Sequence, residues 1–190
     1  LKVKVGSRPI GEDVERLGRV REAAGEGREL RADANGAWSR DEARRALEDL
    51  TELDVTYVEQ PLPADDLAGH ADLRGRGVEI ALDEALARHA ADAILDAGAA
   101  DVLILKPMVL GGVDRAREIA TNARDAGVEA VVTTTIDGVV ARTAAVHLAA
   151  SLPDLPTCGL ATADRLAGDL GPDPAPVEGG AISVPQDDGL

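Results

Sequence analysis

Positive charge is what this sequence has least of. Its 20 Lys and Arg residues stand against 35 Asp and Glu residues, which gives a formal net charge of −15 over 190 residues. Such a surplus repels phosphate groups, so it excludes proteins that bind nucleic acid or anionic membranes by neutralising phosphates. Only three of the basic residues are lysines, namely Lys2, Lys4 and Lys106. This scarcity makes the positions of the lysines informative.

Long apolar runs, disulfides and aromatic residues are missing as well. No run approaches the roughly 18 apolar residues that a membrane-spanning helix needs, and the single cysteine, Cys158, cannot form an internal disulfide. Because no positively charged start is followed by an apolar stretch, we expect no signal peptide and a reducing, cytoplasmic location. Phe is absent, with one Trp and one Tyr. The core of this globular protein must therefore be built mainly from Ala, Val, Leu and Ile.

What the sequence has instead is a repeated unit: a short apolar run, a polar loop and an amphipathic helix. This alternation predicts an α/β fold in which helices join parallel strands. The predicted strands cover residues 1–5, 30–32, 55–58, 78–82, 102–105, 130–134 and 157–161. The predicted helices lie near residues 10–25, 40–50, 65–74, 86–97, 113–126, 138–151 and 163–170.

Two local signals refine this prediction. Ser39 and Glu42 have the spacing of a capping box, in which each side chain accepts a hydrogen bond from the other residue's backbone N–H, so a helix should begin there. Within residues 171–190, Pro172, Pro174, Pro176 and the Gly179-Gly180 pair forbid a regular helix. We expect this segment to form an irregular tail on the surface.

Charged residues close five of the apolar runs, 29, 26, 24 and 23 residues apart: Lys4, Asp33, Glu59, Asp83 and Lys106. A (β/α) barrel takes about 25 to 30 residues for each strand, helix and their loops, and it builds its active site at the C-terminal ends of the strands. The spacing therefore favours a TIM-type barrel over residues 1–170, rather than an open doubly wound sheet, which would spread the strand ends along a line. Barrels usually have eight strands, so we expect the first one to precede Leu1.

Three of these five residues are carboxylates on adjacent predicted strand ends: Asp33, Glu59 and Asp83. Like charges at close range cannot all stay ionised unless a cation lies among them. A site with oxygen ligands alone, without His or Cys, favours a hard divalent ion, above all Mg²⁺. Any single acid could instead cap the helix that follows it. Three at successive strand ends favour a metal site.

The lysines indicate what such a metal would be for. Lys2 and Lys4 alternate with apolar residues, so both side chains should point to the same side of their strand, towards the barrel interior. Arg keeps its proton near neutral pH, whereas a desolvated Lys beside another cation can act as a base. A solvated surface pair is the alternative. A chain that uses Arg almost everywhere, yet retains Lys here and at Lys106, favours proton transfer by Lys4.

Five ordered motifs resemble one known family. They are Lys2-Val3-Lys4, Asp33-Ala34-Asn35, Glu59-Gln60-Pro61, Asp83-Glu84 and Lys106-Pro107. In that order and spacing they are similar to the enolase superfamily, specifically its muconate-lactonizing enzyme subgroup, over essentially the whole chain. The resemblance implies a (β/α)7β barrel, Mg²⁺ (or Mn²⁺ as a substitute) on the three carboxylates, and abstraction of a proton next to a substrate carboxylate to give an enolate. It also implies an N-terminal capping domain, which we expect to precede this chain.

The same resemblance assigns roles to the lysines. Lys4 would be the base, Lys2 the neighbouring cation that favours its neutral form, and Lys106 the cation on the opposite face of the substrate, or a second acid or base. The partner this implies is a small-molecule carboxylate, and whether the protein forms a homo-oligomer stays open. The alternative from another class is a non-catalytic barrel whose carboxylates bind a structural cation, which would have no use for the lysines.

Residues 157–166 and the loop from Lys106 to Gly112 resemble o-succinylbenzoate synthases, lyases of menaquinone biosynthesis that perform a syn-dehydration. Gly111 and Gly112 could present backbone N–H groups to a second substrate carboxylate, although a plain strand-to-helix turn explains them equally well. Asn35 and Thr134 are further candidate substrate contacts. Dipeptide epimerases, N-acylamino acid racemases and cycloisomerases share the catalytic residues and remain alternatives.

The histidines give weaker signals. His70 and His89 lie in predicted helical segments, and we interpret both as solvated surface residues.

Overall fold

The computed structural model describes residues 1–153 and 156–187. The chain divides into two compact units, Leu1–Leu103 and Ile104–Leu190. Strands and helices alternate in both, and the strands follow the order β1-β2-β3-β4-β5-β6 along the sheet, so each pairs with its neighbour in the sequence. This arrangement confirms the predicted α/β class with parallel strands.

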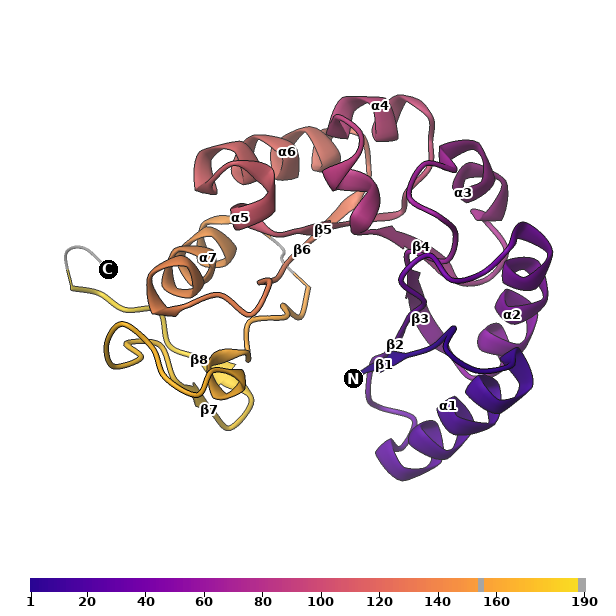
Figure 1. The fold of residues 1–190 in the computed structure, drawn as a ribbon, viewed down its shortest axis with the longest axis horizontal. Helices are drawn as coiled ribbons and strands as arrows, with labels where there is room; N and C mark the ends of the chain where they lie inside the picture. The colour runs from indigo at the N-terminus through magenta and orange to yellow at the C-terminus, as the bar shows by residue number, and fades with distance from the viewer. Residues whose placement is uncertain (154–155, 188–190) are drawn as a thin grey trace. The chain divides into compact units, whose positions relative to one another are not determined.

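The first unit holds strands β1 (Lys2–Lys4), β2 (Leu30–Asp33), β3 (Val55–Glu59) and β4 (Glu79–Leu82), and the first half of β5 (Val102–Leu105). All of these pairs are parallel. Its helices are α1 (Ile10–Ala24), α2 (Arg40–Glu52), α3 (Leu67–Leu73), the short 3₁₀ helix η1 (Glu84–Ala87) and α4 (Ala91–Asp96). Figure 1 shows α1 to α4 following one another along the outer side of these strands.

The start of α2 confirms the predicted capping box. The Ser39 backbone N–H donates to Glu42 Oε2 over 2.9 Å, and the Glu42 N–H donates to Ser39 Oγ over 3.4 Å. From there α2 buries residues that recur at helical spacing against the sheet: Ala43, Ala46, Leu47 and Leu50. The interior of this unit is aliphatic as expected, with Trp38 and Tyr57 as its buried aromatic residues.

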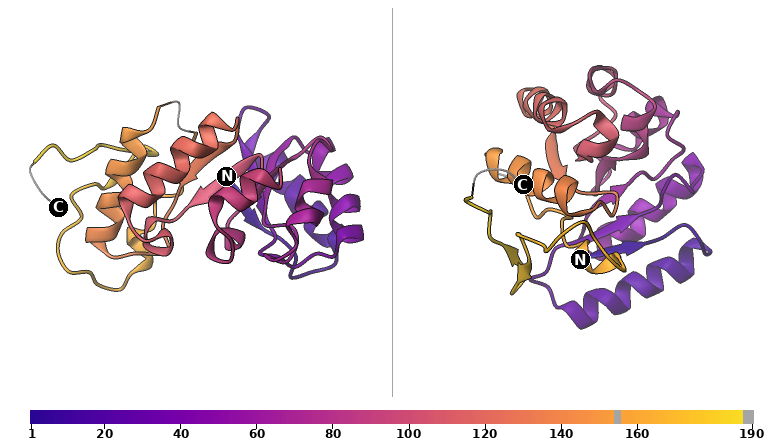
Figure 2. Two further views of the ribbon diagram at one scale, coloured as in Figure 1. Left: turned by 90° about the horizontal axis from the view of Figure 1, so that it is seen from above. Right: turned by 60° about the vertical axis from the view of Figure 1, so that its left-hand side comes forward.

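The second unit holds the end of β5, then α5 (Pro107–Leu110), α6 (Val113–Asp125), β6 (Glu129–Val132), α7 (Val139–Ser151), the 3₁₀ turn η2 (Ala163–Arg165), β7 (Val177–Glu178) and β8 (Ala181–Ile182). Helices α6 and α7 lie beside β6 (Figure 2). Val132, Val146 and Leu148 form the centre of this unit's core.

Two elements predicted after α7 are wrong. Residues 157–161 are not a strand: their sheet contact is a single parallel bridge between Gly159 and Thr133. Residues 163–170 form only the short turn η2 instead of a helix. A contact distant in the sequence holds this segment instead, because the Asp169 carboxylate accepts a hydrogen bond from the Val139 N–H at the start of α7 over 2.9 Å. Gly168 also disfavours a helix over these residues, because glycine is a poor helix former.

The predicted tail is also more ordered than expected, within its described residues 171–187. The Gly-Gly pair, with φ of +59° and +83°, forms the turn of the β7–β8 hairpin rather than an irregular segment. Ala175 is fully buried and accepts a hydrogen bond from Arg142, so part of this segment belongs to the core and not to the surface. Arg142 also donates to Asp173 over 2.5 Å.

Within the part of the chain that the structure covers, we find no helix both long and apolar enough to cross a membrane.

Candidate active site

Strand register brings the predicted lysines and carboxylates together in the first unit. Lys4 on β1 lies opposite Asp33 on β2, and Asp33 lies opposite Glu59 on β3. All three end their strands, so they share one edge of the sheet. Because side chains alternate along a strand, Lys2 and Lys4 project to the same side. Their salt bridges to the same carboxylate, Asp33, agree with that prediction.

The charged groups at this edge are tightly paired. Lys2 Nζ donates to both Glu59 oxygens over 3.1 and 2.9 Å and lies 2.9 Å from Asp33 Oδ2. Lys4 Nζ donates to Asp33 Oδ2 over 2.7 Å and to Asn35 Oδ1 over 2.5 Å. Asp33 and Glu59 are 0% and 1% exposed, whereas the Lys4 side chain is 64% exposed. The carboxylates therefore form a buried floor, and Lys4 reaches towards solvent.

The pKa values of the two buried carboxyl groups, Glu59 and Asp33, are shifted in opposite directions. Burial, together with the nearby negative charges of Asp33 and Asp83, raises the pKa of Glu59 to about 7 against the opposing effect of Lys2. Burial also acts on Asp33, but hydrogen bonds from Lys4 and Lys2 outweigh it and hold the pKa of Asp33 below its usual value. For Lys2, desolvation is outweighed by the charge of Glu59 and the hydrogen bond to Asp33, so its pKa is raised.

Asp83 follows the end of β4 and is 7% exposed. It stands at the N-cap position of η1, yet its side chain makes no capping hydrogen bond to that helix. The alternative interpretation of this acid as a helix cap therefore fails. Asn35 Nδ2 donates to the neighbouring Glu84 Oε1 over 2.7 Å, which links the loops that follow β2 and β4.

The carboxylates fit a hard divalent cation by their chemistry. They are buried, they offer only oxygen ligands, and burial and the charges of Asp33 and Asp83 together raise the pKa of Glu59. In this structure the carboxylates of Asp33 and Glu59 contact the ammonium groups of Lys2 and Lys4. Among residues 1–153 and 156–187, no group of three His, Cys, Asp or Glu side chains is arranged to hold a metal. The metal site therefore stays a prediction that rests on the donor set.

The sequence pattern assigns no role at the site to two residues of this region, His70 and Gln60. His70 is fully buried, so its interpretation as a solvated residue is wrong. It contacts Gln60, which lies one residue beyond Glu59 and is itself 1% exposed. Leu73, three residues after His70 in α3, is the sequence signal that could have indicated an inward-facing His70, because residues at this spacing share one face of a helix.

The remaining candidates lie in the second unit. Lys106 stands between β5 and α5, where its carbonyl accepts hydrogen bonds from the first turn of α5. Gly111 and Gly112 have φ of +97° and +121°, which favours glycine, and both donate their N–H groups to the Pro107 carbonyl. These donors serve the turn itself. Thr134 is 6% exposed and its hydroxyl pairs with that of Thr162 over 2.8 Å.

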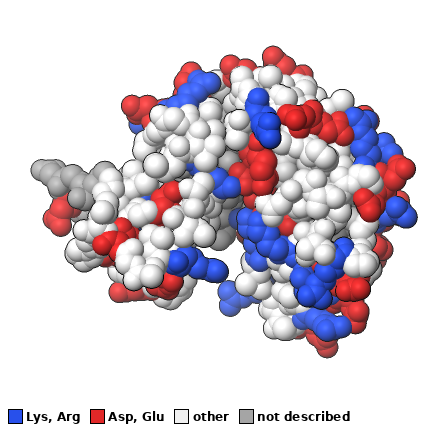
Figure 3. All heavy atoms as spheres, viewed as in Figure 1, with Lys and Arg blue, Asp and Glu red and all other residues white. Residues whose placement is uncertain are grey.

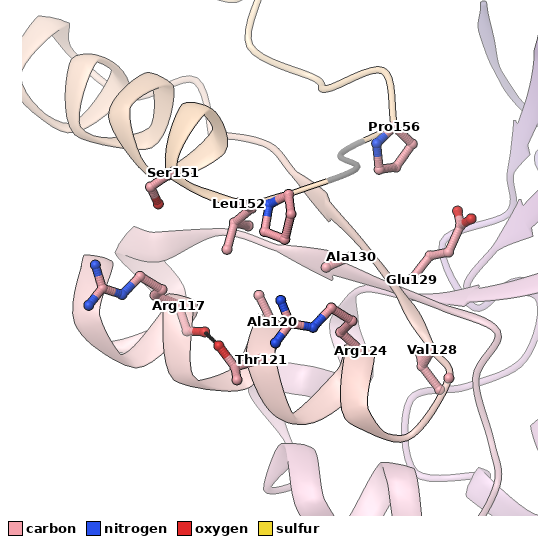
Figure 4. Close-up of a pocket in the computed structure, with 12 residues that line it drawn as sticks. Arg117, Ala120, Thr121, Arg124, Val128, Glu129, Ala130, Ser151, Leu152 and Pro156 are labelled. Atoms are coloured by element: carbon pink, nitrogen blue, oxygen red, sulfur yellow. Dashed lines mark hydrogen bonds between the residues drawn. The ribbon is translucent and has the colours of Figure 1, made fainter.

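A cavity of about 470 Å³ in the second unit is not the candidate site. It is lined by one face of α6, the start of β6 and residues after α7, including Arg117, Thr121, Arg124 and Glu129 (Figure 4). Parallel α/β folds carry their active sites at the C-terminal ends of the strands, and this cavity lies at the N-terminal end of β6.

Comparison with known proteins agrees with this geometry. All of residues 1–190 match the family model described as "Enolase C-terminal domain-like". The o-succinylbenzoate synthase of Thermobifida fusca is 43% identical, over 94% of this chain and 56% of that protein. The o-succinylbenzoate synthase of Mycobacterium tuberculosis is 40% identical, over 94% of this chain and 54% of that protein. The chain thus spans about half the length of these curated relatives.

Solved structures show the same fold. The muconate lactonizing enzyme of Pseudomonas putida superposes with a TM-score of 0.91 at 23% identity, over 97% of this chain and 52% of that chain. The L-Ala-D/L-Glu epimerase of Bacillus subtilis, solved with a substrate ligand, superposes with a TM-score of 0.90 at 33% identity, over 97% of this chain and 53% of that chain. The predicted barrel-type fold is confirmed by these matches.

Proposed function

The chain belongs to the enolase superfamily, and on that premise we propose that it is the barrel part of a cytoplasmic, Mg²⁺-dependent o-succinylbenzoate synthase. The observation that carries the proposal is the pair of lysines on β1 in contact with buried carboxylates at the ends of β2 and β3. The 43% identity to the Thermobifida fusca enzyme supports this substrate.

Asp33, Glu59 and Asp83 would hold the Mg²⁺. A bound divalent ion supplies positive charge beside the substrate carboxylate, where negative charge develops once the adjacent C–H proton leaves. The proposed role of the protein is to place a base next to that proton. Lys4 suits this role because its side chain is 64% exposed while its strand is anchored in the sheet.

As an ammonium, Lys4 donates hydrogen bonds to Asp33 and Asn35, and as a base it must give up its charge. In the proposed reaction neutral Lys4 takes the proton next to the carboxylate. The ammonium so formed stands on the face from which the hydroxyl leaves in a syn-dehydration, and it returns the proton to release water, so atoms and charge balance. We propose Lys106 as the second lysine of the reaction.

Replacement of the base tests this proposal. Lys4→Arg keeps the charge and the contact to Asp33 but cannot act as a base near neutral pH. In the full-length protein with Mg²⁺, we expect o-succinylbenzoate formation to fall by at least about 10²-fold in kcat, the usual contribution of a general base. The matched control is Arg8→Lys, an exposed change in the same strand-to-helix loop, which should leave turnover unchanged. Retained turnover in Lys4→Arg would remove Lys4 from proton transfer.

A second candidate reaction is epimerisation of a dipeptide or an N-acylamino acid, which uses the same proton abstraction. The 33% identity to the L-Ala-D/L-Glu epimerase of Bacillus subtilis favours it. A substrate panel separates the two: the full-length protein should dehydrate the o-succinylbenzoate precursor much faster than it racemises N-acylamino acids or dipeptides. Racemisation without dehydration would replace our assignment. Cation binding with no turnover on any carboxylate would favour the non-catalytic barrel.

A further inference from the structure

We propose that His70 is a positioning residue of this site: through Gln60 it holds the backbone segment that carries Asp83 and thereby sets the affinity of the carboxylates for a divalent cation. The inference rests on the proposed function, in which Asp83 is one of the ligands. It concerns two buried side chains to which neither the reaction nor the sequence pattern assigns a role.

Gln60 uses the full hydrogen-bonding capacity of its amide group. Its Oε1 accepts from the backbone N–H groups of Asp83 and Ala85, each over 3.1 Å. Its Nε2 donates to the Leu62 carbonyl over 3.1 Å and lies 3.3 Å from His70 Nε2. A buried amide with two acceptor and two donor contacts has no better alternative orientation. Gln60 therefore ties the start of η1 to the end of β3.

His70 determines which way that amide points. Its Nδ1 lies 2.8 Å from the Asp66 carbonyl, which can only accept, so Nδ1 carries the proton. Nε2 of the neutral ring is then an acceptor, and it receives hydrogen bonds from the Leu62 N–H and from Gln60 Nε2. A reversed Gln60 amide would set its oxygen against two acceptors, His70 Nε2 and the Leu62 carbonyl, and its NH₂ against the backbone N–H groups of Asp83 and Ala85. The tautomer of His70 thus helps to hold Gln60 Oε1 towards Asp83 and Ala85.

The hydrogen bonds that Gln60 accepts from the backbone around Asp83 indicate a role for Gln60 beyond packing. An acid at an N-cap commonly accepts hydrogen bonds from backbone N–H groups two or three residues ahead. Here the N–H of Ala85, two residues after Asp83, is bound by Gln60 instead, and the Asp83 side chain makes no capping bond. Gln60 takes over the capping function at this helix start. The Asp83 carboxylate is therefore not required for it and can serve the cation site.

Two substitutions of His70 separate the hydrogen bond of Nδ1 to Asp66 from the contact of Nε2 with Gln60. In His70→Asn the amide NH₂ can still reach the Asp66 carbonyl, but nothing reaches Gln60. In His70→Gln the longer side chain offers an acceptor near the position of Nε2 and loses the bond to Asp66. We expect Mn²⁺ binding to the full-length protein, followed by electron paramagnetic resonance, to weaken about 10-fold or more in His70→Asn, as is usual when an outer partner of a metal site is removed. In His70→Gln it should change much less.

A purely structural His70 gives a different result. Each variant loses hydrogen bonds and should melt earlier, but Mn²⁺ affinity would then be unchanged in both or reduced equally in both, and either outcome overturns the proposal. His89→Asn, a partly exposed histidine of the same unit, is the control and should bind Mn²⁺ normally. If His70→Asn does not fold, Gln60→Met, which keeps the volume and removes the amide, should show the same loss of affinity, and normal affinity there equally overturns it.

Asp83→Asn distinguishes failure of this proposal from failure of the proposed function. Unchanged Mn²⁺ binding in Asp83→Asn would remove the predicted ligand itself, and with it the site. Weakened binding in Asp83→Asn together with normal binding in His70→Asn would leave the site in place and reject only the positioning role of His70.

Discussion

At the scale of single residues, buried charge in the first unit is matched by nearby partners. Arg31 is 7% exposed and donates to Glu29 over 2.7 Å. Its guanidinium also lies 4.8 Å from the centroid of the Tyr57 ring, a cation–π contact. Strand register explains this arrangement, because Arg31 on β2 lies opposite Lys2 on β1 and Tyr57 on β3. Arg31 is two residues before Asp33, so the two side chains project to the same side of the sheet. The site thus stands on a layer of paired polar side chains.

Tyr57 offers a direct test of this burial. Desolvation raises the pKa of Tyr57 to about 12 from the usual 10, with Arg31 opposing the shift. The folded state therefore favours the neutral phenol, so this group contributes stability that is present below pH 10 and is lost as the pH rises from 10 towards 12. Since the chain contains one Tyr, the absorbance of tyrosinate in an alkaline titration should show a midpoint near 12. Tyr57→Phe should abolish the step, and a midpoint near 10 in folded protein would show that the Tyr57 hydroxyl is not desolvated.

At the scale of elements, the loop after β1 is held by hydrogen bonds with the helix that follows it. The fully formed α1 reaches back to the loop after β1: Asp13, 2% exposed, accepts from the Gly6 N–H over 2.7 Å and from Arg16 over 2.8 Å. Arg16 also donates to the Lys4 carbonyl. Helix α1 therefore holds the backbone of Lys4, the proposed base, in place.

The capping box of α2 gives the element-scale prediction. Ser39→Ala removes the acceptor for the Glu42 N–H, and N-cap changes of this kind cost about 1 kcal/mol of unfolding free energy. Urea unfolding followed by circular dichroism measures it. Glu42→Gln, which retains the motif, is the matched control and should lose less. Equal losses in the two variants would show that the Ser39 hydroxyl has no particular role.

At the scale of the whole molecule, most acidic residues lie on the surface. On the face shown in Figure 3, acidic side chains are spread widely rather than gathered in one patch. Asp13, Asp33, Glu59 and Asp83 are buried, and each faces hydrogen-bond donors or the predicted cation site. The remaining surplus repels itself and so weakens the compact state.

Salt should relieve this repulsion. The net charge of −15 is constant, whereas the screening length falls from about 10 Å at 0.1 M salt to about 3 Å at 1 M. We expect the urea midpoint to rise between low and molar KCl, because screening of the net repulsion outweighs the loss of exposed ion pairs, each worth at most about 1 kcal/mol. An uncharged co-solute at equal osmolality is the control. A midpoint that stays constant or falls would show that the surplus does not limit stability.

The sequence by itself determined the α/β class, six of the seven predicted strands, the start of α2 and the alignment of Lys4, Asp33 and Glu59 at one sheet edge. These features depend on spacing and on neighbours within a few residues, which a linear pattern records. The tertiary structure alone decided the rest. Residues 163–170 form only the turn η2, and Asp169 binds the start of α7, 30 residues away. His70 is buried and contacts Gln60 across the β3–α3 loop. Such contacts depend on which surfaces meet after folding, and no local periodicity encodes that.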